Sequence, residues 1–388
     1  MTTTQPERRV SATYDHRDPA FAPHPQARWK QLRDEEPIGF SENYEGFHVV
    51  SRYEDVCHVA RTPEYFSSCI NAIPPLPVTF PPISYDPPDN RNYRLLVNPY
   101  FSLTSLAAHA GWIDDVAERI VTPLLAGDRF DFAFDLGVPL TRDVILRLMG
   151  ITNPPAEMNE WSDRFVQQDG DVAGAAANLL RFLGEEIADR RVNPGDDVLS
   201  GLVQGKFEDR LLNDQELVQM ALLLLTAGLE TTNSAMTTTT MYLVDHPEVC
   251  AEFVARPEIQ DLAMDEFVRY ASPATAQARK VIKDTELHGC PMHAGDQLQI
   301  IWASANRDER EFPNPDEIIL DRFPNRHVGF GMGSHRCVGS HLAKMVMKAA
   351  LSRVIPVLHE WEIENRDQLE WHAGEVRSLR TLPLVRKS

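Results

Sequence analysis

One cysteine is the residue of this chain best placed to do chemistry. Cys337 follows a loop that contains Gly331 and Gly333, and glycine lets a backbone turn tightly and lie close to a flat ligand. From Leu342 onward, apolar residues recur at i, i+3, i+4 and i+7, which predicts a helix that begins just after the cysteine. The partial positive charge at a helix N-terminus favours the thiolate form of a nearby cysteine. Cys337 is therefore a candidate metal ligand or nucleophile.

The neighbours of Cys337 leave three other interpretations open. A free cysteine is often a small buried apolar side chain and nothing more. His335, Cys337 and His341 could bind zinc, but they offer only three ligands and lack the Cys-x-x-Cys pairs of structural zinc sites. A nucleophilic pair of Cys337 with a histidine is the third interpretation, although no orienting Asn or Asp is identifiable.

A long helix is the second element that could position reactive groups. Asn213-x-x-Glu216 is a capping box, and the helical pattern then continues to Asp245. This length is well above that of an average helix. Because the helix is apolar on all sides, it must cross the interior of the protein.

The middle of this helix carries a carboxylate beside a hydroxyl, Glu230 and Thr231. Gly228 weakens the helix, and the Thr231 hydroxyl can bond to the carbonyl of Ala227 four residues earlier, so we expect a kink or local bulge here. One interpretation is a polar patch where the helix reaches the surface. The other is a pair that delivers protons to a bound reactant.

Several segments together resemble one known family. The segment Phe330-Gly331-x-Gly333-x-His335-x-Cys337-x-Gly339 matches the haem-binding loop of the cytochrome P450 family at every fixed position, and Ala227-Gly228-x-Glu230-Thr231-Thr232 resembles its acid–alcohol element. Glu266-x-x-Arg269 is similar to a third element, and the motifs occur in the family's order over about residues 20–388. The resemblance implies a mainly α fold with small β-sheets, a triangular prism that holds haem between the long central helix and the cysteine loop. We therefore expect a polar N-terminal arm (residues 1–22) and one domain (residues 23–388), instead of the two domains that length alone suggests.

The resemblance also implies the cofactor, haem b, and the residues around it. Cys337 would ligate the iron, with Phe330 and Gly331 shielding the sulfur. Arg94, Arg279 and His327 are expected to bind the propionates, and Asn90, which stands where many relatives have histidine, is a further candidate. Glu266, Arg269 and Arg322 would form a structural triad, although an exposed Glu–Arg pair would need no function.

A proline-rich stretch from 67 to 88 is too apolar for a solvated linker and too rich in proline for a helix or central strand. Long irregular loops in compact proteins are often lids or binding loops, and the resemblance implies that this one caps the substrate pocket. The candidate pocket residues are Ile73, Leu76, Val78, Phe80, Leu223, Ala227, Ala274, Thr275, Gln277, Val376 and Leu379. Most are apolar, which predicts a small or medium hydrophobic substrate. Arg377 either binds a substrate carboxylate or faces solvent at a turn.

The implied activity is that of a haem-thiolate monooxygenase, which inserts one oxygen atom of O2 into the substrate. Glu230 and Thr231 would supply protons, and electrons would come from a separate ferredoxin with its reductase. A basic face over the thiolate side would bind an acidic ferredoxin; its residues are Arg91, Arg336, Lys344 and Lys348. The alternatives are an atypical enzyme of this fold that catalyses coupling, nitration or rearrangement, and a non-catalytic haem sensor of a gas or ligand.

Composition bounds the partners and the compartment. The formal net charge of −19 argues against nucleic acid or an anionic membrane as the main partner. The five cysteines are scattered and odd in number, unlike a disulfide framework. The first residues contain no apolar run, so we expect neither a signal peptide nor a membrane anchor. We expect a monomer in the cytoplasm.

Overall fold

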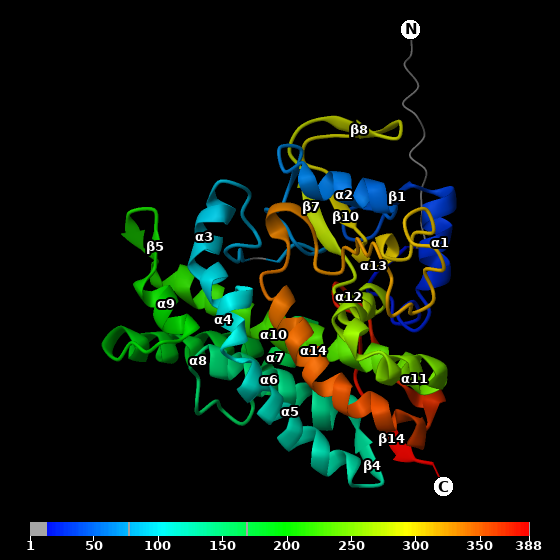
Figure 1. The fold of residues 1–388 in the computed structure, drawn as a ribbon. Coiled ribbons are helices and arrows are strands. Elements are labelled where there is room, and N and C mark those ends of the chain that lie inside the picture. Colours follow the sequence, from blue (N-terminus) through cyan, green and yellow to red (C-terminus); the bar gives the residue numbers. More distant parts are fainter. Residues whose placement is uncertain (1–13, 77, 168–169, 388) are drawn as a thin grey trace.

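The computed structural model describes residues 14–76, 78–167 and 170–387 of the chain, as a mainly helical body with its five-stranded main sheet at one side and smaller sheets elsewhere (Figure 1). The helices are α1 (Gln26–Glu35), α2 (Tyr53–Arg61), α3 (Asp89–Val97), α4 (Leu103–Ala107), α5 (Ala110–Leu125), α6 (Val138–Leu148), α7 (Met158–Gln167), α8 (Val172–Val192), α9 (Val198–Gln204), α10 (Asp214–Asp245), α11 (Pro247–Ala255), α12 (Gln260–Ala271), α13 (Trp302–Ala305) and α14 (Ser340–Val354). None of the helices in these ranges is long and apolar enough to span a membrane.

The central helix α10 begins and ends where the sequence predicts. Asn213 Oδ1 accepts a hydrogen bond of 2.9 Å from the Glu216 amide, and Glu216 Oε2 accepts one of 2.8 Å from the Asn213 amide, which completes the capping box. Helices α6, α8, α12 and α14 pack around α10. The expected bulge is absent from the secondary structure, because α10 continues as α-helix through Gly228. The hydroxyl of Thr231 does bond back to the Ala227 carbonyl at 2.8 Å, as expected.

The main sheet has five strands in the order β1-β2-β10-β7-β3, and only the β2–β10 pair is parallel, with Leu298 opposite His48. Its strands are β1 (Ile38–Ser41), β2 (Phe47–Val50), β3 (Phe66–Ser67), β7 (Gln277–Val281) and β10 (Gln297–Ile300). The smaller sheets pair β11 (Trp361–Ile363), β14 (Pro383–Arg386) and β4 (Arg129–Asp131); β12 (Trp371–His372) and β13 (Ser378–Leu379); β5 (Lys206–Phe207) and β6 (Arg210–Leu211); and β8 (Thr285–Leu287) and β9 (Cys290–Met292). The first residue of β7, Gln277, lines the cavity described below.

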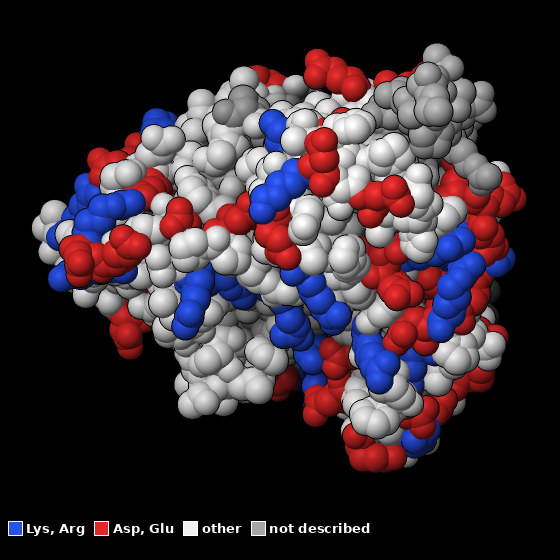
Figure 2. All heavy atoms as spheres, turned by 90° about the horizontal axis from the view of Figure 1, so that it is seen from above, with Lys and Arg blue, Asp and Glu red and all other residues white. Residues whose placement is uncertain are grey.

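The proline-rich stretch after β3 holds no helix or strand up to α3 among its described residues, as expected; Pro77 in this stretch lies outside the described residues. The face at the top of Figure 1, near the main sheet, carries acidic and basic side chains interspersed with one another (Figure 2).

The segment from residue 14 to 22 is part of the folded body, which corrects the expected arm; residues 1–13 of that arm lie outside the described residues. Tyr14 is 1 % exposed and packs edge-on against Phe47 in an apolar cluster under the main sheet. Arg377 holds the end of this segment, since its Nε donates to the Ala22 carbonyl at 2.6 Å. The Arg377 guanidinium also lies 3.6 Å from the Trp371 ring centre, so this arginine is buried and neither faces solvent nor lines the cavity.

One carboxylate fastens this N-terminal segment to two other parts of the chain. Glu375 accepts from His16 and Arg17, at 3.2 Å each, and from the Ile73 amide of the proline-rich stretch at 3.0 Å. Burial alone would raise the pKa of the Glu375 carboxyl, but these donors outweigh it and lower the pKa to about 2. Folding therefore favours the ionised form of Glu375.

This ionised clasp predicts a pH-dependent contribution to stability. A carboxyl with a lowered pKa in the folded state stabilises the fold above its unfolded pKa, and this contribution is lost as pH falls through the folded value. We expect Glu375→Gln to lower the free energy of unfolding by about 1–3 kcal/mol at pH 7. The difference from the unmodified protein should shrink below about pH 4.5. Denaturant unfolding at a series of pH values measures it.

Glu160→Gln is the matched control, because Glu160 is exposed and pairs only across a helix turn with Arg164 at 2.7 Å. Glu160→Gln should lower the free energy of unfolding by less than about 0.5 kcal/mol at every pH. A Glu375→Gln effect that is equally small would contradict the clasp.

Candidate active site

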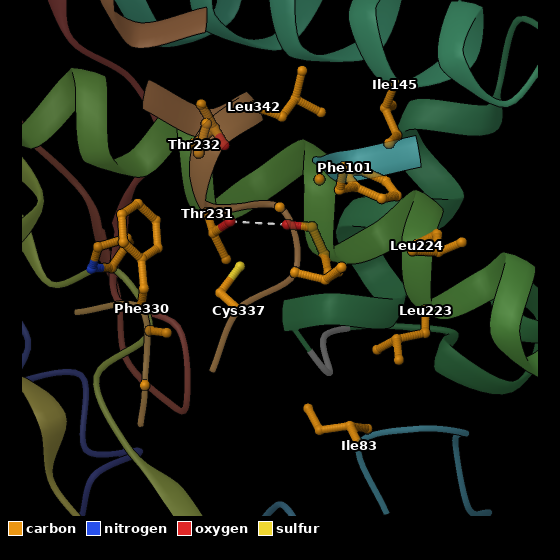
Figure 3. Close-up of a pocket in the computed structure, with 18 of the residues that line it drawn as sticks. Ile83, Phe101, Ile145, Leu223, Leu224, Thr231, Thr232, Phe330, Cys337 and Leu342 are labelled. Carbon is orange, nitrogen blue, oxygen red and sulfur yellow. Dashed lines mark hydrogen bonds between the residues drawn. The ribbon is translucent and has the colours of Figure 1, made fainter. Parts of the chain in front are cut away.

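A cavity lies between α10 and the loop that precedes α14, and it is bordered by both predicted chemical elements. It encloses about 1600 Å³ of empty space, open solvent included, and most of its lining is apolar. Figure 3 shows Thr231 of α10 and Cys337 of the loop beside one another at one part of this space, with Ile83, Leu223 and Leu224 around another part.

The glycines of the loop allow its path beneath the cavity. Gly331 and Gly333 adopt φ values of +66° and +68°, in the left-handed region that glycine enters without strain. A side chain at Gly333 would also collide with the Ala60 carbonyl, because its Cβ would lie 2.7 Å from that oxygen. The amide of Cys337 donates to the Phe330 carbonyl at 2.7 Å, which closes the loop on itself.

The Cys337 sulfur is exposed to the cavity but lies deep within the protein. Burial raises the pKa of the thiol, whereas a hydrogen bond from the Gly339 amide and the charges of Arg94 and Arg336 lower it. Burial is the larger effect, so the pKa of the Cys337 thiol is raised overall. From the sequence we expect the helix N-terminus to favour the thiolate, but this effect alone does not outweigh burial. The amide and the two arginines would nevertheless stabilise a sulfur that has released its proton on binding a metal.

A group of basic side chains borders the cavity around the same loop. Arg94 and His335 line the cavity, and the charge of nearby Arg279 acts on His335. Burial lowers the pKa of the Arg279 guanidinium to about 10, and burial with the two arginines lowers the pKa of His335 to about 3. Asn90 donates through Nδ2 to the Pro82 carbonyl at 2.9 Å and lies 3.2 Å from His335 Nδ1. His335 Nε2 is buried and has no hydrogen-bond partner within the described ranges.

His335 lines the cavity, whereas His327, expected from the sequence to face the haem propionates, does not. The His327 ring turns to α12, where its Nε2 lies 3.2 Å from Asp265 Oδ1, and it is not part of the cavity lining. Its Nδ1 accepts from the Gly329 amide at 3.2 Å, so both ring nitrogens are engaged outside the cavity. From the sequence, we identify His335 as part of the haem-binding loop motif and as a possible zinc ligand, but not as a propionate partner. Its place two residues before Cys337, on the same loop, was the available signal.

The two members of the acid–alcohol pair have different surroundings. Thr231 lines the cavity together with Thr232, whereas Glu230 is half-buried and lies outside the lining. Gly228 also borders the cavity, and an added Cβ there would lie 3.1 Å from the Ile145 side chain, so the helix approaches α6 closely. The hydroxyl of Thr231 is thus the member of the pair that faces the space above Cys337.

Four of the expected pocket residues line the cavity: Leu223, Ala227, Ala274 and Gln277. The others lie elsewhere. Ile73 packs under the main sheet, Phe80 packs against Phe165, and Leu379 belongs to the main core. Val78 is 46 % exposed, Leu76 packs at the edge of the core, Thr275 bonds to the Pro273 carbonyl, and Val376 forms a bridge to Ala274.

Among the described residues of the proline-rich stretch, Pro81, Pro82 and Ile83 are the ones that line the cavity. Of its earlier apolar residues, Ile73 and Phe80 are buried in the core and Leu76 packs at its edge, whereas Val78 is exposed. Several lining residues escaped the sequence analysis because they lie on helices that looked like ordinary core, among them Phe101, Val144, Ile145, Met220 and Leu224. Only the apolar face of each helix could have indicated them, and that face is common to any core helix.

Comparison with known proteins agrees with this geometry. The family model for cytochrome P450 matches residues 254–371. The chain is 30 % identical to the putative cytochrome P450 YjiB of Bacillus subtilis, over 87 % of this chain and 88 % of that protein. The chain belongs to the cytochrome P450 family. It is also 31 % identical to a steroid C26-monooxygenase of Mycolicibacterium smegmatis, over 84 % of this chain and 83 % of that protein.

Solved cytochrome P450 structures share the fold. CYP109E1 from Bacillus megaterium, in complex with testosterone, superposes with a TM-score of 0.85 at 26 % identity, covering 94 % of this chain and 98 % of that one. The polyketide synthase cytochrome P450 PksS of Bacillus subtilis gives a TM-score of 0.84 at 27 % identity, over 97 % and 100 % of the two chains. The chain thus has the P450 fold expected from its motifs, and it is an enzyme of the monooxygenase class.

Proposed function

We propose that the chain binds haem b in the cavity between α10 and the cysteine loop and hydroxylates a hydrophobic substrate there. The observation that carries this proposal is the pairing of an open Cys337 sulfur with a separate basic group in one cavity. Haem has both features to match, an iron that accepts a thiolate and two propionates that need cationic partners. When bound, haem supplies the binding and reductive activation of dioxygen.

Each cofactor contact is assigned to a residue with the fitting chemistry. Cys337 would ligate the iron, while Phe330 and Gly331 line the cavity beside it. Arg94, Arg279 and His335 would hold the propionates, since the unpartnered Nε2 of His335 needs a hydrogen-bond partner. Asn90 would set the orientation of the His335 ring through its contact with Nδ1. These assignments leave His327 to hold the loop against α12.

Proton delivery is assigned to Thr231. Its hydroxyl lines the cavity and already donates to the Ala227 carbonyl, so its oxygen lone pairs remain to accept a proton from water and its own proton can be passed on. Glu230, adjacent in sequence and half-buried outside the lining, would exchange protons with solvent. Thr231 would then connect this acid to the reacting oxygen.

The substrate assigned to the cavity is a hydrophobic molecule of small or medium size. The side chains around its upper part are apolar, from Val97, Phe101, Val144 and Ile145 to Leu223 and Leu224. Gln277 adds an amide, whose Oε1 accepts from the Trp302 indole at 3.3 Å. Related proteins act on such molecules, including a linalool 8-monooxygenase of Pseudomonas putida that is 28 % identical over 93 % of this chain and 95 % of that protein.

The electron donor we propose is a ferredoxin that docks on the thiolate side of the molecule. Two of the four basic residues expected there already have acidic partners, Lys344 with Asp265 at 3.0 Å and Lys348 with Asp261 at 2.7 Å. Arg91 and Arg336 are exposed, and neither forms an ion pair with the described part of the chain. These two arginines would therefore provide most of the attraction for an acidic donor.

The haem-thiolate assignment predicts a spectroscopic signature. Purified protein that is reduced and exposed to carbon monoxide should show the long-wavelength Soret band after which the family is named. Cys337→Ser should lose this band because a hydroxyl does not replace a thiolate as a ligand. Cys69→Ser is the control, since Cys69 is exposed and far along the chain from the loop, and it should retain the band. A band that survives Cys337→Ser would overturn the assignment of the ligand.

The assignment of Thr231 predicts uncoupling of electron transfer from product formation. Thr231→Ala removes the hydroxyl, and we expect product formed per electron pair to fall by about tenfold or more, with hydrogen peroxide released instead. Thr231→Ser keeps the hydroxyl and should keep most of the coupling. The measurement compares product and peroxide yields with linalool or testosterone, whichever shifts the spin state of the iron. Equal coupling in Thr231→Ala and the unmodified enzyme would contradict the role.

The docking proposal predicts a charge-dependent reduction rate. Arg336→Glu should slow reduction by an acidic ferredoxin by about tenfold at low ionic strength, and added salt should diminish the difference. Arg181→Glu is the control, because Arg181 is an exposed residue of α8 that pairs with Glu185. Stopped-flow measurement of haem reduction gives both rates. Identical salt dependence for the two variants would rule out Arg336 as part of the docking face.

A further inference from the structure

A second cluster of reactive side chains lies outside the cavity, at the junction of the main sheet and the β8–β9 hairpin. Cys290 begins β9 and is partly exposed, and its Sγ lies 3.9 Å from Nδ1 of His48 on β2. Nε2 of the same ring lies 3.1 Å from Oδ2 of Asp296, in the turn before β10. The hairpin forms the upper edge of the molecule beside α2 (Figure 1).

The chemistry of this cluster follows from the two sides of the imidazole. The Asp296 carboxylate can only accept, so Nε2 carries the proton that it shares with Asp296. Nδ1 is then the basic nitrogen, and it is the one that faces Cys290. This is the nucleophile–base–orienter arrangement that activates a thiol by removing its proton.

A metal site is excluded by the same geometry. His48 presents opposite ring nitrogens to Cys290 and Asp296, so the three side chains cannot converge on one ion. No group of three metal-binding side chains with suitable geometry occurs anywhere in the described ranges. Burial strengthens the case for a fixed base, because His48 is 0 % exposed and its ring is held edge-on against Phe40.

We propose that Cys290 is a modification site, a thiol activated by His48 and Asp296 that forms mixed disulfides with low-molecular-weight disulfides. The Cys290 proton moves to His48 Nδ1, and the thiolate attacks one sulfur of the disulfide. A new S–S bond forms as the old one breaks, and the released half leaves as a thiolate that is protonated by the imidazolium or by water. No net oxidant is needed beyond the disulfide itself.

The chain contains its own reference for this reaction. Cys69 is exposed, whereas Cys57 and Cys250 are buried and Cys337 would be held by iron. The Cys69 thiol forms no hydrogen bond with a histidine of the described residues, and the Cys69 amide donates to Ser67 Oγ at 3.1 Å. Cys69 therefore reports how an exposed thiol reacts without a nearby histidine. Its greater exposure works against the proposal, which makes the comparison stringent.

The test exposes the haem-loaded, full-length protein to glutathione disulfide at pH 6 and follows both cysteines by peptide mass spectrometry. An activated thiol with a pKa about two units below an ordinary one has about eighty times more thiolate at pH 6, and its lower nucleophilicity removes about eightfold of this gain. We expect Cys290 to react about tenfold faster than Cys69. Equal or slower reaction of Cys290 would overturn the proposal.

Asp296→Asn tests the roles of the neighbours while keeping a side chain of the same shape. It should bring the Cys290 rate to within about twofold of Cys69 at pH 6 and move the midpoint of the Cys290 pH profile upward, while Cys69 stays unchanged. The other titratable side chains on α2 and in or beside the hairpin are Tyr53, Glu54, Asp55, Cys57, His58, Arg61, Asp284, Glu286, His288 and His293. An unchanged midpoint would remove Asp296 from the cluster. If Asp296→Asn does not fold, His48→Gln replaces it, and its Cys290 rate and pH midpoint are compared with those of the unmodified protein. An unchanged rate and midpoint would then remove His48 from the cluster.

Discussion

The architecture around the active site depends on the ion pairs of one fully buried carboxylate, that of Glu266 on α12. Its oxygens accept from Arg269 at 2.7 and 2.8 Å and from Arg322 Nε at 3.1 Å, and Asn325 and the Ile319 amide add further hydrogen bonds. A buried charge is tolerated only when it is paired and its lone pairs are satisfied. Breaking one of these contacts would leave an uncompensated charge in the core, at a cost of about 3–5 kcal/mol.

The arginines of this cluster extend its influence to the cysteine loop. Arg269 also donates to the carbonyls of Asn306, Pro315 and Glu317. The Asn306 side chain in turn accepts from the Val328 amide at 2.7 Å, at the start of the loop that leads to Cys337. The position of the Cys337 loop is therefore linked to an ion cluster whose members, Glu266, Arg269 and Arg322, are not among the described residues that line the cavity.

The sequence predicted best where local chemistry decides the structure. The bounds of α10 followed from a capping box at Asn213 and Glu216, whose partners are three residues apart. The cysteine loop followed from its glycines, two of which adopt backbone angles that other residues rarely adopt. The P450 fold and the placement of Cys337 in a loop before a helix could both be predicted in this way, from a family resemblance that rests on short motifs. Both elements could be recognised from short motifs because their signals, a capping box and a run of spaced glycines, lie within a few residues of one another.

Predictions failed where a distant partner decides which way a side chain turns. His327 and His335 lie on the same loop, and Asp265 of α12 draws the first of them away from the cavity. The segment from residue 14 looked like a solvated arm because its partner, Glu375, lies near the other end of the chain. In the proline-rich stretch, the residues that line the cavity lie a few positions later than predicted. Ile73 and Phe80 pack in the core against residues distant in the sequence, and this could not be predicted from the stretch itself.

The Glu375 clasp has a consequence for the order in which the protein folds. Its bond to His16 joins residues 359 positions apart, and its bond to the Ile73 amide joins residues 302 positions apart. Contacts this distant along the chain carry a large loop-closure entropy and form only after local helices have assembled. Once the helical body exists, the clasp should be among the last contacts to form. It should also be among the first to open by local unfolding, and its opening would release the N-terminal segment and the proline-rich stretch together.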